Sequence, residues 1–133
     1  MTQFNELGLA APLLRALEEE GYTTPTPIQA QAIPAAISGR DVLGIAQTGT
    51  GKTAAFSLHP LHRLANDPKR AAPYTCRVLI LSPTRELASQ IHESVRAYGR
   101  HIRPSTALIF GGVPENPQKR AMAKGVDVLI ATP

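Results

Sequence analysis

The chain has 133 residues, of which 43% are hydrophobic and 18% charged, an ordinary composition for one soluble globular domain. Its net charge of +4 mildly favours an anionic partner, but a surplus this small does not identify nucleic acid by itself. A single cysteine, Cys76, excludes an intramolecular disulfide and a cysteine-based zinc site, and it fits a reducing cytoplasm.

The first part of the chain, residues 1–40, is expected to be helical. An amphipathic helix is predicted over residues 9–20, because its leucines share one face. Thr26 and Pro27 then open a second helix, as its cap and its first-turn residue. Pro34 is expected to divide that helix into two pieces. No apolar run here or later in the sequence approaches the length of a membrane-spanning helix.

The second part, residues 41–133, alternates apolar runs with loops and helices. Continuous apolar strands alternating with helices predict an α/β fold, with a parallel sheet flanked by helices on both faces. Right-handed crossovers bring each loop that follows a strand to the same edge, where open α/β sheets bind their ligands. Strands are expected at 42–46, 77–81, 106–110 and 126–131, and the helices between them at 52–65, 86–100 and 117–124.

Residues 46–53 have the pattern of a phosphate-binding loop (P-loop), since they follow an expected strand and open an expected helix. Backbone N–H groups of such a loop curl around phosphate oxygens, and the helix N-terminus adds a favourable dipole. Lys52 can reach the outer phosphates of ATP, and the Thr53 hydroxyl can hold Mg²⁺. We therefore expect Lys52 and Thr53 to be catalytic, and the nucleotide to contact Ala46, Gln47, Thr48, Gly49, Thr50, Gly51, Lys52 and Thr53.

The sequence AQTGTGKT resembles motif I of the DEAD-box RNA helicases, in which Ala is usual at the first position. Residues 21–29 resemble the Q motif of the same family, whose Gln offers a donor and an acceptor that match N6 and N7 of adenine. The resemblance also implies an upstream aromatic residue that stacks on the base; Phe4 fills that place, belongs to the core, or does both. Expected adenine-side residues are thus Phe4, Tyr22, Thr24 and Gln29.

Three loops at the same expected sheet edge resemble RNA-binding motifs of this family. Residues 83–88 match motif Ia, in which the Thr84 hydroxyl and the Arg85 fork suit an RNA phosphate, although a simple helix cap explains Thr84 as well. A glycine pair resembles the GG motif, and the last residues resemble the start of motif Ib. The resemblance implies RNA contacts at Pro83, Thr84, Arg85, Gly111, Gly112, Thr132 and Pro133.

The resemblance covers the chain from Phe4 to Pro133, and it is strongest to bacterial members of the RhlE or RhlB kind. It implies an incomplete RecA-like domain, since the DEAD box, the SAT motif and the second RecA-like domain do not occur in this sequence. The whole protein is expected to be a cytoplasmic, RNA-stimulated ATPase that uses ATP and Mg²⁺ to separate RNA duplexes. Proteins of RNA degradation or ribosome assembly are candidate partners, and these 133 residues are expected to bind nucleotide at most.

Two other functions stay open, a P-loop domain of a DNA helicase and a non-enzymatic nucleotide- or RNA-binding module.

The family resemblance also implies that strands absent from this sequence separate the strand at 42–46 from the other three. We therefore expect that strand either to pair directly in a rearranged sheet, to complete a swapped dimer, or to await strands of a longer protein.

Overall fold

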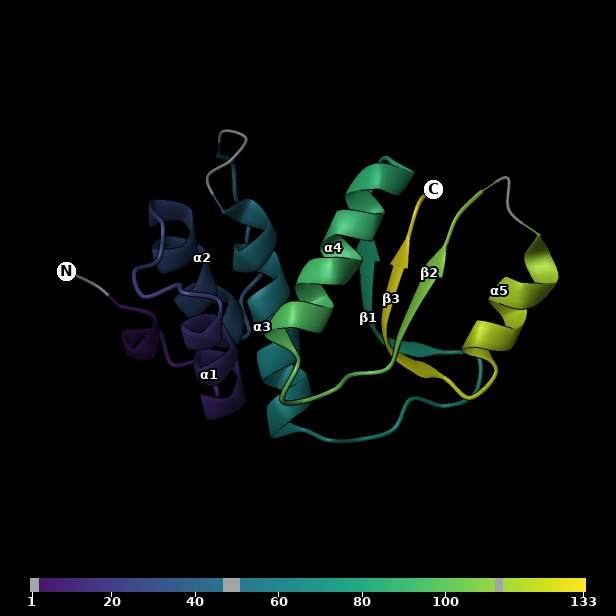
Figure 1. Cartoon of the computed structure of the whole chain (residues 1–133), viewed down its shortest axis with the longest axis horizontal. Coiled ribbons are helices and arrows are strands. Elements are labelled where there is room, and N and C mark those ends of the chain that lie inside the picture. Colours follow the sequence, from purple (N-terminus) through teal and green to yellow (C-terminus); the bar gives the residue numbers. More distant parts are fainter. Residues whose placement is uncertain (1–2, 47–50, 112–113) are drawn as a thin grey trace.

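The computed structural model describes residues 3–46, 51–111 and 114–133 (Figure 1). A short 3-10 helix, η1 (Phe4–Glu6), precedes the helices α1 (Ala11–Glu19), α2 (Pro27–Ile37) and α3 (Lys52–Asn66). The remaining elements alternate strand and helix: β1 (Cys76–Leu81), α4 (Arg85–Tyr98), β2 (Thr106–Ile109), α5 (Glu115–Met122) and β3 (Val126–Ala131). Among the described residues, no helix is long and apolar enough to cross a membrane.

The three strands form one parallel sheet in the order β1-β3-β2, which confirms the predicted α/β class. In its register, Val128 of the central strand lies beside Val78 of β1 and Thr106 of β2. The last strand in the chain is therefore the middle strand of the sheet. This arrangement brings the carboxyl ends of all three strands to one edge (Figure 1).

The two faces of the sheet are covered unequally. Val128 and Ile130 face a core of buried side chains from α1, α2, α3 and α4, and both are at most 1% exposed. On the other face, Ala107 packs with Met122 of α5 in a smaller cluster, which Val126 at the start of β3 also joins. The large cluster joins the helical region to the sheet, so the two predicted parts of the chain share one core.

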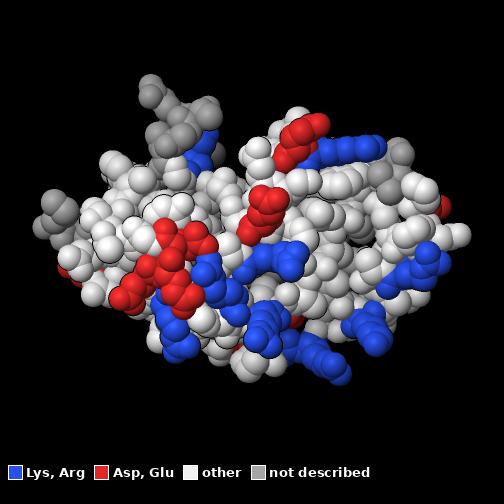
Figure 2. All heavy atoms as spheres, viewed as in Figure 1, with Lys and Arg blue, Asp and Glu red and all other residues white. Residues whose placement is uncertain are grey.

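An ion cluster fastens the end of α1 to the end of α4. Arg100 donates to the carboxylate of Glu19 at 3.2 Å and also to that of Glu20, while His101 contacts Glu19. Figure 2 shows acidic side chains gathered at this end of α1 against neighbouring basic ones. The Glu19 pKa is held below its ordinary value, first by the hydrogen bond from His101. These ion pairs are largely solvent-exposed, so each contributes little to the free energy of unfolding. Their role is to orient α1 against the end of α4.

The strand predicted at 42–46 was wrong, because residues 41–46 form no strand in the structure. Leu43 and Ile45 are 87% and 83% exposed, and the segment pairs with no strand of the sheet. An apolar run becomes a strand only when neighbours accept its backbone hydrogen bonds. Among the described residues, the direct pairing in a rearranged sheet, one of the expected alternatives, does not occur.

Pro34 does not divide the second helix, as the sequence had suggested. α2 runs through it without interruption from Pro27 to Ile37, and the N–H of Ser38 reaches the Pro34 carbonyl at 3.2 Å. A proline removes one helical hydrogen bond but keeps a helix-compatible φ. Packing of the fully buried Ile33 against the core offsets that loss.

Candidate nucleotide site and RNA edge

A cavity of about 1120 Å³ lies where the loop before α2, the start of α3 and α4 meet. It is lined from segments that are far apart in the sequence. The predicted nucleotide-binding residues that line it are Phe4, Tyr22, Thr24, Gln29, Gly51, Lys52 and Thr53. The structure therefore brings the described parts of the two predicted nucleotide motifs to one cavity.

Gln29 joins these two motifs by hydrogen bonds from both ends of its side-chain amide. Its Oε1 accepts from the Thr26 N–H at 2.9 Å, which ties the amide to the start of α2. Its Nε2 donates to the Gly51 carbonyl at 3.2 Å, which ties it to the start of α3. Gln29 is only 7% exposed. One amide N–H and one lone pair on Oε1 remain, so the amide can still offer adenine a donor and an acceptor.

Gly51 is the N-cap of α3 and has the left-handed φ of +86°. A Cβ at this position would lie 2.4 Å from Gln29 Nε2, closer than side chains approach one another. Its backbone conformation therefore favours glycine, and a side chain here would also displace the Gln29 amide. The absence of a side chain at Gly51 lets the start of α3 lie directly beside the Gln29 amide.

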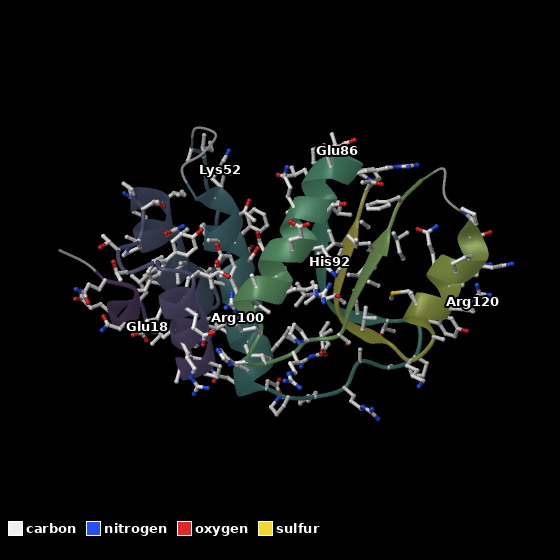
Figure 3. The ribbon with its side chains drawn as sticks, in the orientation of Figure 1. Glu18, Lys52, Glu86, His92, Arg100 and Arg120 are labelled. Carbon is white, nitrogen blue, oxygen red and sulfur yellow. The ribbon has the colours of Figure 1, made fainter. Side chains whose placement is uncertain are left out.

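Lys52 and Thr53 occupy the first turn of α3, where free backbone N–H groups and the helix dipole favour anions. Figure 3 places Lys52 at the same end of the molecule as Glu86, in the first turn of α4. Lys52 makes no ion pair with the described residues, so its ammonium group can meet a phosphate. Of the remaining loop, Ala46 does not line the cavity, and Gln47, Thr48, Gly49 and Thr50 lie outside the described residues.

The Thr53 hydroxyl is a hard oxygen ligand of the kind that Mg²⁺ accepts. Within residues 3–46, 51–111 and 114–133, no three His, Cys, Asp or Glu side chains gather as a metal cluster. Mg²⁺ commonly takes one or two protein ligands and completes its shell with phosphate oxygens and water. A single hydroxyl beside a phosphate-binding helix start fits that mode.

The aromatic residues of the cavity differ in exposure. Phe4 is 5% exposed and belongs to the hydrophobic core, yet its side chain also lines the cavity, so both expected roles are compatible with its place. Tyr22 is 50% exposed, and its ring centroid lies 6.4 Å from that of Tyr98. Burial raises the pKa of Tyr98 to about 12. Sequence reasoning missed Tyr98, because a lone aromatic residue at a helix end matches no motif.

The predicted RNA residues gather at the carboxyl edge of the sheet. The Thr84 hydroxyl caps α4 by accepting from the Leu87 N–H at 3.1 Å, which confirms the cap interpretation and leaves its O–H available to donate. Pro83 is exposed beside it, while the Thr132 N–H donates to Ile109 at 3.0 Å and Pro133 is exposed. Gly112 lies outside the described residues.

Arg85 makes contacts that the sequence did not suggest. Its guanidinium donates to the carbonyl of Gly111 and lies 5.7 Å from the centre of the Phe110 ring. The motif Ia loop and the first glycine of the GG pair are therefore in direct contact. Arg85 remains exposed, and its other N–H groups are available to a phosphate.

Comparison with known proteins agrees with this arrangement. The model of the DEAD/DEAH box helicase family matches residues 26–133. Over 133 residues the chain is 47% identical to the "ATP-dependent RNA helicase DeaD" of Escherichia coli (strain K12), covering 99% of this chain and 20% of that protein. Over 130 residues it is 45% identical to the "DEAD-box ATP-dependent RNA helicase RhpA" of Helicobacter pylori (strain B128), covering 98% of this chain and 25% of that protein.

A solved structure extends the similarity to three dimensions. The chain superposes with a TM-score of 0.83 on the RNA helicase Prp28 from Chaetomium thermophilum bound to ADP, at 40% identity, covering 99% of this chain and 32% of that one. The chain thus spans a minor part of its relatives, and the narrower likeness to the RhlE or RhlB kind stays a prediction. With the family model over residues 26–133, and with Gln29 joined to the start of α3, the chain belongs to the DEAD/DEAH box helicases.

Proposed function

We propose that a full-length protein carrying this sequence is an ATP-dependent RNA helicase, an RNA-stimulated ATPase that separates RNA duplexes. The observation that carries the proposal is the hydrogen bond from Gln29 Nε2 to the Gly51 carbonyl. It places a group suited to adenine beside a helix start suited to phosphates, within one cavity. The names of the relatives, which include "ATP-dependent RNA helicase DeaD", support the same activity.

In this proposal the described residues bind and orient the nucleotide. Gln29 offers its remaining donor and acceptor to the adenine edge, and Tyr22 packs near the base. Lys52 and the N–H groups of the first turn of α3 hold the outer phosphates, and Thr53 offers its hydroxyl to Mg²⁺. Bound Mg²⁺ would supply charge neutralisation at the phosphates. The sequence contains no DEAD tetrapeptide, so we assign these 133 residues nucleotide binding and not hydrolysis.

RNA is proposed to lie along the carboxyl edge of the sheet, against Pro83, Thr84, Arg85, Gly111 and the Thr132–Pro133 end. These groups offer hydroxyl, guanidinium and backbone contacts to phosphates, which position a strand without selecting its sequence. We further propose a cytoplasmic location, with proteins of RNA degradation or ribosome assembly as partners. The lone cysteine, Cys76, is unpaired, which supports a reducing compartment.

Two substitutions in the full-length protein test the nucleotide site. Lys52→Ala should abolish measurable ATP binding, because it removes the cation that meets the outer phosphates. Gln29→Ala should instead reduce the preference for ATP over GTP in competition binding, because the adenine-matched amide is lost. An unchanged preference for ATP in Gln29→Ala would refute the adenine role. Gln31→Ala, an exposed glutamine on the same helix, is the matched control.

Stimulation of ATP hydrolysis by RNA and by DNA separates the proposal from its alternatives. Stimulation by single-stranded RNA and not by DNA of the same sequence supports the RNA helicase. Equal stimulation by DNA favours a DNA helicase, and nucleotide binding without any hydrolysis favours a binding module.

A further inference from the structure

The end of β2 depends on a side chain of α5. Among the described residues β2 is an edge strand that pairs with β3 alone, and its last ladder contact is the Thr132 N–H donating to the Ile109 carbonyl at 3.0 Å. The next N–H, that of Phe110, is beyond the ladder. Gln118 of α5 provides its acceptor, with Oε1 at 2.7 Å. The N–H of Phe110, the residue after β2, is therefore bonded to Gln118 rather than to the sheet.

The other end of the same amide is also engaged. Gln118 Nε2 donates to the carbonyl of Pro114, the N-cap of α5, at 3.3 Å. One side chain thus holds Phe110, where the chain leaves β2, and Pro114, where it enters α5. Gln118 is partly buried, whereas Asn116 and Lys119 around it are exposed. Its turn of α5 therefore faces the sheet, which fits a constrained amide and not a solvated one.

Arg85 reaches the same place from α4. Its guanidinium donates to the Gly111 carbonyl and lies 5.7 Å from the Phe110 ring centre. Gly111 follows Phe110, whose N–H is held by Gln118. The position of the Gly111 carbonyl, and with it the direction of the Arg85 side chain, consequently depends on the Gln118 amide.

We propose that Gln118 is a positioning residue for RNA binding, which sets the end of β2 so that Gly111 and Arg85 face a phosphate strand together. The inference rests on the proposed function, because it assumes that RNA lies at this edge. Gln118 itself makes no contact with RNA in this role. It acts through Phe110, Gly111 and Arg85.

The test uses the full-length protein with an ATP analogue that is not hydrolysed and a fluorescent single-stranded RNA. Gln118→Met keeps the volume of the side chain but removes both hydrogen bonds, and Gln118→Ala is the second variant. We expect either to weaken RNA binding about tenfold, which two hydrogen bonds of ordinary strength can supply. Asn116→Ala, on the same helix and exposed, should bind RNA like the unmodified protein.

Three further readouts separate positioning from a merely structural role. In Gln118→Met the ATP affinity should stay unchanged, although the loss of two native hydrogen bonds lowers the melting temperature somewhat. The slope of log RNA affinity against log salt should fall, by at most the one unit expected for Arg85→Ala, because the role acts through Arg85. Arg85→Lys combined with Gln118→Met should weaken binding by less than the product of the two single effects, because both act through Gly111. RNA affinity that falls only in parallel with the melting temperature and ATP affinity would overturn the inference.

The outcomes also distinguish this inference from the proposed function. If the unmodified protein binds RNA and Arg85→Ala weakens that binding while Gln118→Met does not, the positioning role is refuted and the RNA proposal stands. If the unmodified protein binds no RNA at all, the proposed function fails, and the role of Gln118 fails with it.

Discussion

The backbone N–H of Ala10 donates to Nδ1 of His62 over 3.0 Å, although 52 residues separate the two. Ala10 is the N-cap of α1 and His62 lies in α3, so the bond joins two helices of the core. Because Nδ1 accepts, the neutral ring carries its proton on Nε2. Burial, and then the charge of Arg63, lower the pKa of His62 from its ordinary value of 6.5.

Acidification should weaken the fold through His62. The folded pKa lies below the unfolded one, so between these values the unfolded chain binds more protons, and the free energy of unfolding decreases as the pH is lowered. The contribution is complete above the unfolded pKa of 6.5 and is lost as the pH falls toward the folded pKa. We expect His62→Gln, whose amide oxygen can accept from Ala10, to flatten this dependence in urea denaturation at a series of pH values.

His59 and His92 provide the comparison, because burial is also the first cause that lowers their pKa values. The His92 ring contacts the Thr106 hydroxyl at 2.8 Å and does not bond to α1. In His62→Gln, His59 and His92 should therefore still contribute their own parts of the pH dependence of the free energy of unfolding. A slope identical to that of the unmodified protein would mean that His62 takes no part in the acid response.

Substitution of Gly51 by alanine should disrupt nucleotide binding more than its backbone strain explains. The added Cβ would lie 2.4 Å from Gln29 Nε2, so the amide must move away from the cavity. Gly21 is the matched control, since its φ of +81° is nearly the same but no atom lies within 4 Å of a Cβ there. Each Ala should lower the free energy of unfolding by about 1–3 kcal/mol through left-handed strain. Only Gly51→Ala should also lose ATP affinity in equilibrium titration.

The double substitution Gln29→Ala with Gly51→Ala removes the collision. Its ATP affinity should be no weaker than that of Gly51→Ala alone, because the two changes act on one contact. Strictly additive losses of ATP binding would show that Gly51 and Gln29 contribute independently.

Arg85→Ala should weaken RNA binding by a similar factor for different RNA sequences, since phosphate contacts carry no sequence information. If a free N–H of Arg85 meets a phosphate, the slope of log affinity against log salt should also fall by about one. Arg120→Ala is the charge-matched control, from an exposed cation on α5 (Figure 3). A weaker affinity with an unaltered slope would limit Arg85 to holding Gly111.

The isolated 133-residue chain should self-associate. β1 has no strand on its outer edge among the described residues, and Leu79 and Leu81 on one of its faces are 55% and 63% exposed. Unpaired strand edges beside apolar side chains are sites of further pairing. Light scattering after size exclusion should show an apparent mass that rises with concentration, and Leu81→Lys should reduce it. Tyr74→Lys, at a residue 66% exposed but outside β1, should not. A monomer at all concentrations would exclude this pairing.

The sequence predicted most elements because their signals are local. Leucine periodicity predicted α1 and a continuous apolar run predicted β3, and the bounds of both elements in the structure lie within a few residues of the predicted ones. The strand at 42–46 failed because its hydrogen bonds would have to come from other strands, and no pattern within the run reports whether those exist. The family resemblance predicts that Gln29 and Lys52 share a nucleotide site, and both line the same cavity.

Contacts between distant segments escaped prediction for the same reason. The bond from Arg85 to Gly111 spans 26 residues, and neither residue type signals its partner. Gln118 resembled any solvated glutamine of a polar helix, although its amide bonds to Phe110. Such contacts become visible only after the sheet order has placed β2 beside α5.

The order β1-β3-β2 also bears on how the chain folds during synthesis. β1 and β2 emerge from the ribosome before β3, yet in the described part of the chain no ladder joins them, since each pairs with β3. All ladder hydrogen bonds of the sheet must therefore wait until residues 126–131 are available. The earlier strands stay unpaired for that interval, and sheet formation of this non-local kind is slow and prone to aggregation. The helices α1 to α4 form from local hydrogen bonds and do not depend on β3, so they can collapse together before the sheet forms.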